Sequence, residues 1–182
     1  MLKRLFVLLI ISAVLLWNRE ISGKVYLTRD DALKKAFPET LSIDRHNLFL
    51  EERDISEIES RSGAKVESKL FTYYMAIGSK GVLGYAVIES HVVRTKPEVY
   101  MAVIRPNGEI ESVEILAFYE PEEYLPPARW LAQFTGKRLN ERLWIKRDIQ
   151  GITGATLSAY GLTREVRKVL AIFEIKILQV RK

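Results

Sequence analysis

The chain contains no cysteine among its 182 residues. Disulfide bonds, iron–sulfur clusters, thiolate zinc sites and c-type haem attachment are therefore excluded, because each needs a cysteine sulfur. The two histidines, His46 and His91, lie far apart and do not show the spacing of metal ligands. If the protein carries out redox chemistry, its electrons must reside on an organic cofactor.

The chain also lacks a clustered stripe of lysine and arginine. Its formal net charge is +5 and its pI about 9.4, but the three cations and one carboxylate of residues 1–20 already account for +2. We therefore expect no nucleic-acid partner. The basic residues near the C-terminus are expected to form a solvated helix face: Arg164, Arg167, Lys168, Lys176, Arg181 and Lys182.

The N-terminus has the pattern of a targeting segment. Lys3 and Arg4 precede an apolar run over residues 5–17 that only Ser12 interrupts. Residues 1–23 are predicted to be a signal peptide or a membrane anchor, with the rest of the chain on the extracytoplasmic side. A buried core helix is the alternative interpretation of the same run.

Along the remainder, helix patterns come first, strand patterns follow, and helix patterns return toward the C-terminus. Helices are predicted at 28–37 and 54–62, and a short one at 128–134. Residues 69–77, 82–93, 99–105 and 109–116 are rich in β-branched and aromatic residues and predict strands. Pro106, Asn107 and Gly108 indicate a tight turn between the last two. The uneven apolar spacing from Ile110 to Val113 indicates a bulge. Residues 39–52 predict no element.

The C-terminal helix has the clearest pattern. Apolar residues recur there at a spacing of 3.6, at Leu162, Val166, Val169, Leu170, Phe173 and Ile177. The expected fold is α+β, an antiparallel sheet with packed helices and this long amphipathic helix. The predicted divisions are the targeting segment, a helical segment over 24–63 and a domain over 64–182.

The segment from Ile149 to Ser158 carries the strongest functional signal. It holds two glycines and three hydroxyl residues just before the C-terminal helix. Glycines allow successive N–H groups to point at one bound group, and a helix N-terminus adds free donors and partial positive charge. The pattern fits a phosphate site. A plain strand-to-helix connection with a Ser or Thr cap is the alternative.

The run Thr153-Gly154-Ala155-Thr156-Leu157-Ser158 resembles the Ser/Thr-Gly-Ala-Thr signature of FMN-binding domains. Such domains occur in subunits of Rnf- and Nqr-type electron-transport complexes and in small membrane-anchored relatives. Residues 128–137 and the turn at 106–108 are similar to the family as well, so the resemblance spans about 64–173. It implies that FMN is joined to Thr156 through a phosphoester bond installed by a separate flavin transferase.

The resemblance also implies the other site residues. Thr153, Gly154, Ala155, Leu157 and Ser158 are expected to line the phosphate and ribityl groups. Candidate neighbours for the isoalloxazine ring are Phe118, Tyr119, Trp130 and Phe134, each of which also fits the core.

Several polar residues have two interpretations. Glu120 and Glu123 are either ring-proximal acids or solvated loop carboxylates. His91 is an exposed or cross-strand residue, with proton transfer as the alternative. Arg94 and Lys96 are surface charges, or contacts to phosphate or a partner. One position departs from the family: covalent members usually carry aspartate six residues before the accepting threonine, where this chain has Gln150.

The function implied is electron transfer on one FMN at the extracytoplasmic side of a membrane. The partners implied are membrane redox proteins with iron–sulfur or flavin groups, and the transferase. The chain shows no Rossmann fingerprint. Two rivals remain: a flavin-free scaffold domain, which Gln150 favours, and a reductase-like enzyme that binds FMN non-covalently.

Overall fold

The structure, a computed structural model, describes residues 23–178. The predicted targeting segment lies outside this range except for Gly23, and so do Arg181 and Lys182. Within residues 23–178, every helix is too short or too polar to cross a bilayer.

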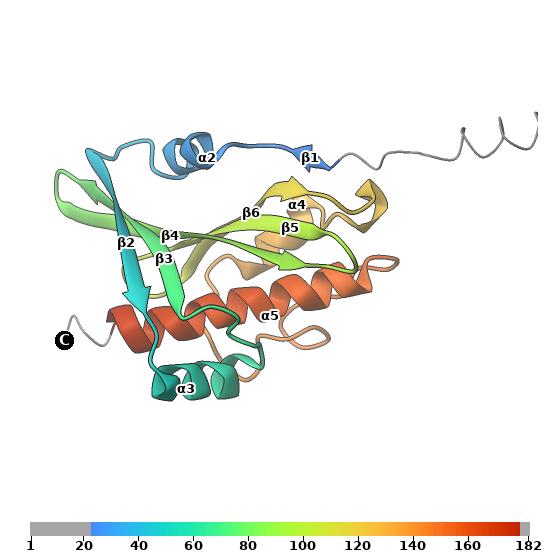
Figure 1. Ribbon diagram of the computed structural model, residues 1–182. Coiled ribbons are helices and arrows are strands. Elements are labelled where there is room, and N and C mark those ends of the chain that lie inside the picture. Colours follow the sequence, from blue (N-terminus) through green and yellow to red (C-terminus); the bar gives the residue numbers. More distant parts are fainter. Residues whose placement is uncertain (1–22, 179–182) are drawn as a thin grey trace, which may run out of the picture.

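The described chain forms one six-stranded antiparallel sheet with helices packed on it, which confirms the predicted α+β class (Figure 1). The strand order is β1-β6-β5-β4-β3-β2. The strands span Lys24–Val25 (β1), Ser42–Phe49 (β2), Leu70–Gly78 (β3), Gly81–Val92 (β4), Pro97–Ile104 (β5) and Ile110–Phe118 (β6).

All four predicted strands are confirmed to within a few residues, as β3 to β6. The predicted bulge is confirmed too, because the β5–β6 register shifts so that Ile104 faces Ile110 and Val103 faces Ser112. Residues 39–52 contain β2, an edge strand. This strand pairs with β3 on one edge only, and its residues are exposed or half-buried. Its sequence therefore mixes charged, polar and apolar residues and shows no clear strand pattern.

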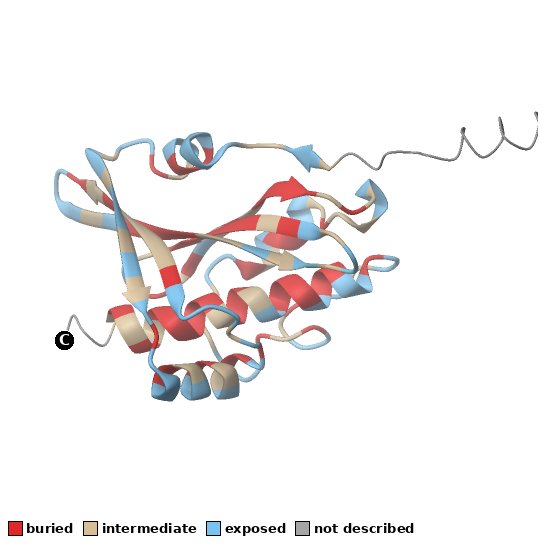
Figure 2. Cartoon of the chain, viewed as in Figure 1, coloured by how far each residue is buried: buried red, intermediate tan, exposed pale blue. Residues whose placement is uncertain are grey.

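Helices lie on both faces of the sheet. One face packs against α3 (Glu52–Ser62), α4 (Ala128–Leu131) and α5 (Thr156–Phe173), and the other against α2 (Arg29–Ala36). Figure 2 shows buried residues running through both the central strands and α5. Successive side chains of β5 point to opposite faces of the sheet. Tyr100 and Ala102 belong to the buried cluster between the sheet and α5, and Met101 and Val103 belong to the cluster between the sheet and α2.

The helix boundaries follow local signals. Thr28 caps α2, as predicted, by accepting a hydrogen bond from the Asp31 N–H at 3.2 Å. Gly63 ends α3 at φ +70°. Three short helical turns complete the set: Glu122–Tyr124 (η1), Ala132–Phe134 (η2) and Glu174–Leu178 (η3), the last a π-helix that continues α5.

The predicted apolar face of α5 is confirmed. The prediction that the basic residues of this helix form a solvated face is wrong for Arg167, which is buried. The six predicted apolar residues are all buried. Arg167 is only 5 % exposed. Its guanidinium donates to the carbonyls of Ser62 (2.9 Å) and Arg61 (2.6 Å) at the end of α3. It also donates to the Asn140 carbonyl (2.7 Å) and lies 4.2 Å from the centre of the Trp144 ring.

The reason is that α5 is enclosed on more than one side. The sheet covers its apolar face, while α3 and the loop over 138–150 cover much of the face expected to be solvated. Lys168 and Glu165 have side chains only 12 % exposed and pair with each other at 2.7 Å. Arg164 is exposed, as predicted.

We predict that Arg167→Met destabilises the protein by about 3 kcal/mol, because it leaves several buried carbonyls without donors. The measurement is the free energy of unfolding in urea. Arg164→Met on the exposed side of the same helix is the matched control and should change stability by less than about 0.5 kcal/mol. Equal effects of the two substitutions would contradict the structural role of Arg167.

Candidate functional site

The signature loop is anchored at its start by the core and by the segment that precedes it. Ile149 is fully buried. The Gln150 backbone is held on both sides, because its carbonyl accepts from Trp130 Nε1 at 2.6 Å and its N–H donates to Gln133 Oε1 at 2.8 Å. The segment 128–134 therefore fixes the position at which the loop begins, while the Gln150 residue itself remains exposed.

The loop then turns sharply into α5. Gly154 has φ +85°, a conformation that favours glycine, and a β-carbon at this position would meet nothing within 4 Å. The Ala155 N–H donates to the Ile152 carbonyl at 3.2 Å, and Thr156 is the first residue of the helix. The turn thus places Thr156 at the end of the helix with open space beside it.

No side chain caps the N-terminus of α5 at Ala155. The first N–H groups of a helix have no partner within the helix, and over 18 residues the aligned peptide dipoles place partial positive charge there. Ala155 therefore does not supply the Ser or Thr cap that the alternative interpretation, a plain strand-to-helix connection, expects. The helix end offers donors and positive potential next to an exposed threonine.

A hollow of about 280 Å³ adjoins this helix end. It is lined by Arg94, Tyr124 and the five residues 154–158. The Arg94 guanidinium lies over the Tyr124 ring, 4.6 Å from its centre. Arg94 comes from the β4–β5 turn and Tyr124 from η1, both far from the signature in sequence. Arg94 was a minor candidate for phosphate contact, and Tyr124 was missed because a tyrosine that follows two glutamates gives no motif.

A second, larger hollow of about 520 Å³ adjoins the first residues of the loop. It is lined by Pro127, Arg129, Trp130, Gln133 and the four residues 150–153. Thr153 therefore faces one hollow and Thr156 the other. Trp130 and Ile152 give this second hollow apolar surface.

The predicted phosphate-site residues are contiguous, but they differ in exposure. Thr153, Gly154, Thr156 and Leu157 are exposed, whereas Ala155 and Ser158 are buried. The Ser158 hydroxyl donates to the Tyr124 carbonyl at 2.6 Å. That bond ties α5 to the loop over 120–127 and holds Tyr124 against the hollow.

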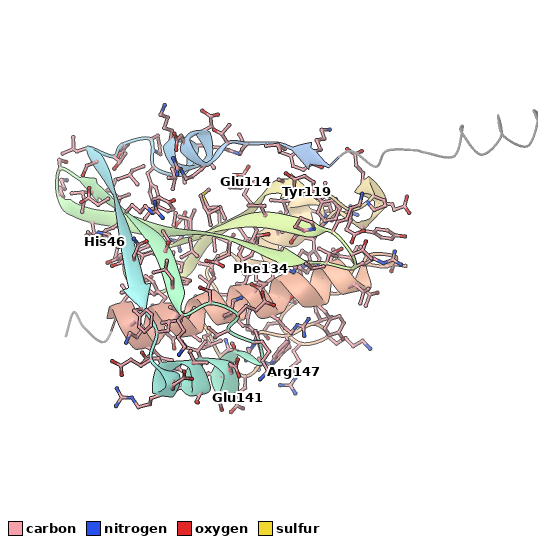
Figure 3. All side chains as sticks on the ribbon, in the orientation of Figure 1. His46, Glu114, Tyr119, Phe134, Glu141 and Arg147 are labelled. Carbon is pink, nitrogen blue, oxygen red and sulfur yellow. The ribbon has the colours of Figure 1, made fainter. Side chains whose placement is uncertain are left out.

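The four aromatic candidates separate into different environments. Phe118 and Phe134 are buried in the main core and line neither hollow. Trp130 is 5 % exposed, packs edge-on against Phe134 at 5.4 Å, and borders the larger hollow. Tyr119 is half-buried near Gly23 and lines neither hollow (Figure 3).

Glu120 was expected to be a solvated loop carboxylate, and this is wrong. It is 7 % exposed, and its Oε1 accepts from the N–H groups of Arg94 (3.1 Å), Thr95 (2.6 Å) and Lys96 (2.8 Å). Burial raises the pKa of Glu120, but these donors together outweigh burial and hold the pKa below its ordinary value. The carboxylate thus fixes the β4–β5 turn that carries Arg94. Glu123 is exposed, as expected.

His91 is a cross-strand residue, as predicted. It lies opposite Glu98 in the β4–β5 ladder, and its Nε2 is 3.0 Å from Glu98 Oε1. It lines neither hollow beside the signature loop.

Comparison with known proteins yields no assignment. A scan against protein families finds no match for this chain. A search of curated proteins finds none either.

We predict that Glu120→Gln destabilises the protein by about 1–2 kcal/mol at pH 7, because the turn loses a charged acceptor for three N–H groups. Since the folded pKa is lowered, the contribution of Glu120 is complete above the ordinary value of 4.5 and is lost as the pH falls through the folded value. The difference between wild type and variant should therefore shrink by pH 3.

Urea unfolding at the two pH values measures this difference. Glu123→Gln in the same loop is the control, and it should match wild type at both. An effect of Glu120→Gln that stays constant from pH 7 to pH 3 would contradict the role of the charge.

Proposed function

We propose that this protein carries electrons on one FMN held at the N-terminus of α5, with Thr156 as the attachment residue. One observation supports this most directly: an exposed threonine is the first residue of an 18-residue helix that lacks a side-chain cap and opens onto a hollow with Arg94. The resemblance of residues 153–158 to the FMN-binding signature gives the ligand.

The site suits a phosphate. A phosphoester keeps about one negative charge, and the helix end favours an anion by roughly 0.3–1 kcal/mol. The Arg94 side chain adds an attraction that is modest at an exposed position, about 0–1 kcal/mol. Both effects orient the phosphate, and neither alone retains a cofactor. Retention is the part that a covalent bond at Thr156 supplies.

The space around the loop suits the rest of the cofactor. Tyr124 and Leu157 offer apolar surface beside Thr156, and Trp130 and Ile152 do so in the larger hollow. The larger hollow, of about 520 Å³, is in the range of about 300–1,000 Å³ that ligand sites occupy, and the hollow beside Thr156, of about 280 Å³, is slightly below it. FMN supplies the redox chemistry when bound, while the chain binds it, orients it and sets its electrostatic surroundings.

Attachment requires an outside enzyme under this proposal. A threonine hydroxyl is a poor nucleophile without a base or metal to activate it. None of the described residues that line the hollow beside Thr156 is a histidine or a carboxylate. A flavin transferase that brings its own activating group therefore fits the site better than self-attachment.

The substitution at Gln150 bears on recognition by that transferase. Gln150 is exposed, and its backbone, rather than a side-chain carboxylate, fixes the loop. The nearest aspartate, Asp148, pairs with Arg142 at 3.2 Å. The loop geometry thus does not depend on an aspartate at position 150, which supports retention of the flavin despite the substitution.

The proposed role is a carrier between membrane redox proteins at the extracytoplasmic face. The exposed end of α5, with Leu157 55 % exposed, leaves the cofactor site accessible to partners that dock transiently over a small area. The flavin-free scaffold and the non-covalent reductase remain as rivals, and both give distinct experimental results.

The test is the intact mass of the full chain, exported beside an active flavin transferase and measured under denaturing conditions. We expect an increase of one FMN minus water, lost completely in Thr156→Val. Thr153→Val is the matched control, because it removes a similar exposed hydroxyl three residues earlier and should keep the modification.

The rivals are separated by the same samples. A folded, yellow protein of unmodified mass would replace the covalent carrier with non-covalent FMN. A folded, colourless protein would favour the scaffold and contradict the proposed function.

A further inference from the structure

A hollow with three arginines on its walls lies apart from the signature loop. Its volume is about 560 Å³, within the range of about 300–1,000 Å³ that ligand sites occupy. Arg61 comes from α3, Arg147 from the loop over 138–150 and Arg167 from α5. Figure 3 shows Arg147 beside α3. Arg167 follows Thr156 by about 16 Å along the helix axis, so this hollow is separate from the proposed cofactor site.

Two of these arginines carry positive charge that no carboxylate neutralises. Arg61 pairs with Glu57 and with Glu174. Within residues 23–178, the guanidinium groups of Arg147 and Arg167 donate only to backbone carbonyls. Buried charges are normally paired, because an uncompensated charge is costly to remove from water.

The two uncompensated charges also act on each other. Burial lowers the pKa of Arg167, and the neighbouring positive charge of Arg147 lowers it further. An anion held between the two guanidinium groups would remove this repulsion. Glu141 is the one carboxylate among the described residues that line the hollow, and it is exposed to solvent, which screens its charge.

Both guanidinium groups retain hydrogen-bond donors for a ligand. The Nη2 atom of Arg167 carries two hydrogens and donates only to the Arg61 carbonyl, at 2.6 Å, among the described residues. Arg147 donates through Nη1 to the Glu141 carbonyl, also at 2.6 Å. Its Nε and Nη2 have no acceptor within the described part of the chain. The hollow therefore combines positive charge with N–H groups that lack partners.

A tight turn fixes the position of Arg147. Lys146 has φ +67°, and it is the one residue other than glycine with positive φ in the described range. Its N–H donates to the Ile149 carbonyl at 2.9 Å, and the Arg147 N–H donates to the Trp144 carbonyl at 3.0 Å. The Trp144 ring lies on the Arg167 guanidinium, 4.2 Å from ring centre to Cζ. A backbone conformation of this kind persists where its surroundings hold it, and such positions cluster at ligand sites.

The charges favour a phosphate over a carboxylate as the ligand. A phosphate attached through one ester bond carries about 1.5–2 negative charges at pH 7 and has three acceptor oxygens. It can therefore accept from Arg147 and Arg167 together, whereas a carboxylate brings one charge and matches a single guanidinium. The volume of the hollow leaves room for the group that bears the phosphate.

We propose that the hollow lined by Arg61, Arg147, Arg167 and Trp144 binds the phosphate group of a phosphomonoester. Arg147 and Arg167 donate to the phosphate oxygens, and Trp144 borders the remainder of the ligand. The phosphate belongs either to a small soluble molecule or to a lipid headgroup. This site does not depend on the flavin or on Thr156.

The experiment follows the tryptophan indole N–H signals of the full chain by NMR while methyl phosphate is added at constant ionic strength, with sodium chloride as the balancing salt. The chain has three tryptophans, and Trp144→Phe assigns the signal of Trp144. We expect this signal to move and to saturate. Dimethyl phosphate, which carries one charge, should bind several-fold more weakly. Trp130, which borders the hollow at the start of the signature loop, reports binding there instead.

Arg147→Met should weaken the binding of methyl phosphate about tenfold, because it removes one charged donor. Arg142→Met is the matched control in the same loop. Arg142 is exposed, pairs with Asp148 and does not line the hollow, so this variant should change the affinity by less than about twofold. Arg167 is left unchanged because its substitution is expected to destabilise the fold.

Three results overturn the site: a Trp144 signal that methyl phosphate leaves unmoved, a response of Trp130 alone, or an equal loss of affinity in the two arginine variants. If Arg147→Met does not fold, the comparison of the monoester with the diester on wild type decides. Bicelles that contain phosphatidate, compared with bicelles of phosphatidylcholine, separate the two sources. Tighter binding to phosphatidate than to methyl phosphate assigns a lipid headgroup, and binding that is no tighter assigns a soluble phosphomonoester.

Discussion

The packing of α5 against the face of β4 and β5 is the interaction on which the other features depend. Its apolar face fills the main core with fully buried residues such as Leu162, Val169 and Phe173. Once that face is fixed, the helix N-terminus must lie beside the β4–β5 turn, and its C-terminal end must lie beside α3. Arg167 and the pairs Arg61–Glu174 and Lys176–Asp54 then join α3 to this end.

The proposed site is held by contacts that fix backbone rather than by the exposed residues themselves. Trp130 and Gln133 bind the Gln150 backbone, Ser158 binds the Tyr124 carbonyl, and Glu120 binds three N–H groups of the turn that bears Arg94. Each contact joins segments far apart in sequence. Such support leaves Thr156 exposed yet fixed in place, which is the arrangement an attachment site needs.

The sequence allowed the elements to be predicted better than their surroundings. Strong local signals, such as the Thr28 cap, the 106–108 turn and the 3.6-residue spacing in α5, gave the elements and the fold class. The wrong predictions concern Arg167 and Lys168 on α5, and Glu120. These are charged residues that look solvated along one element but are covered by another, and only tertiary packing determines that. The β2 edge strand lacked a pattern because little of it is buried. The targeting segment, the division at residue 63 and the flavin itself stay predictions.

The central claim is that Thr156 carries the cofactor. The most direct measurement is tandem mass spectrometry of the tryptic peptide over residues 148–164, taken from the exported protein. This peptide holds five hydroxyl side chains, those of Thr153, Thr156, Ser158, Tyr160 and Thr163, and fragment masses distinguish them. The account predicts the FMN mass on fragments that contain Thr156, with the other four hydroxyls unmodified. An unmodified peptide, or flavin on one of the other hydroxyls, would contradict it.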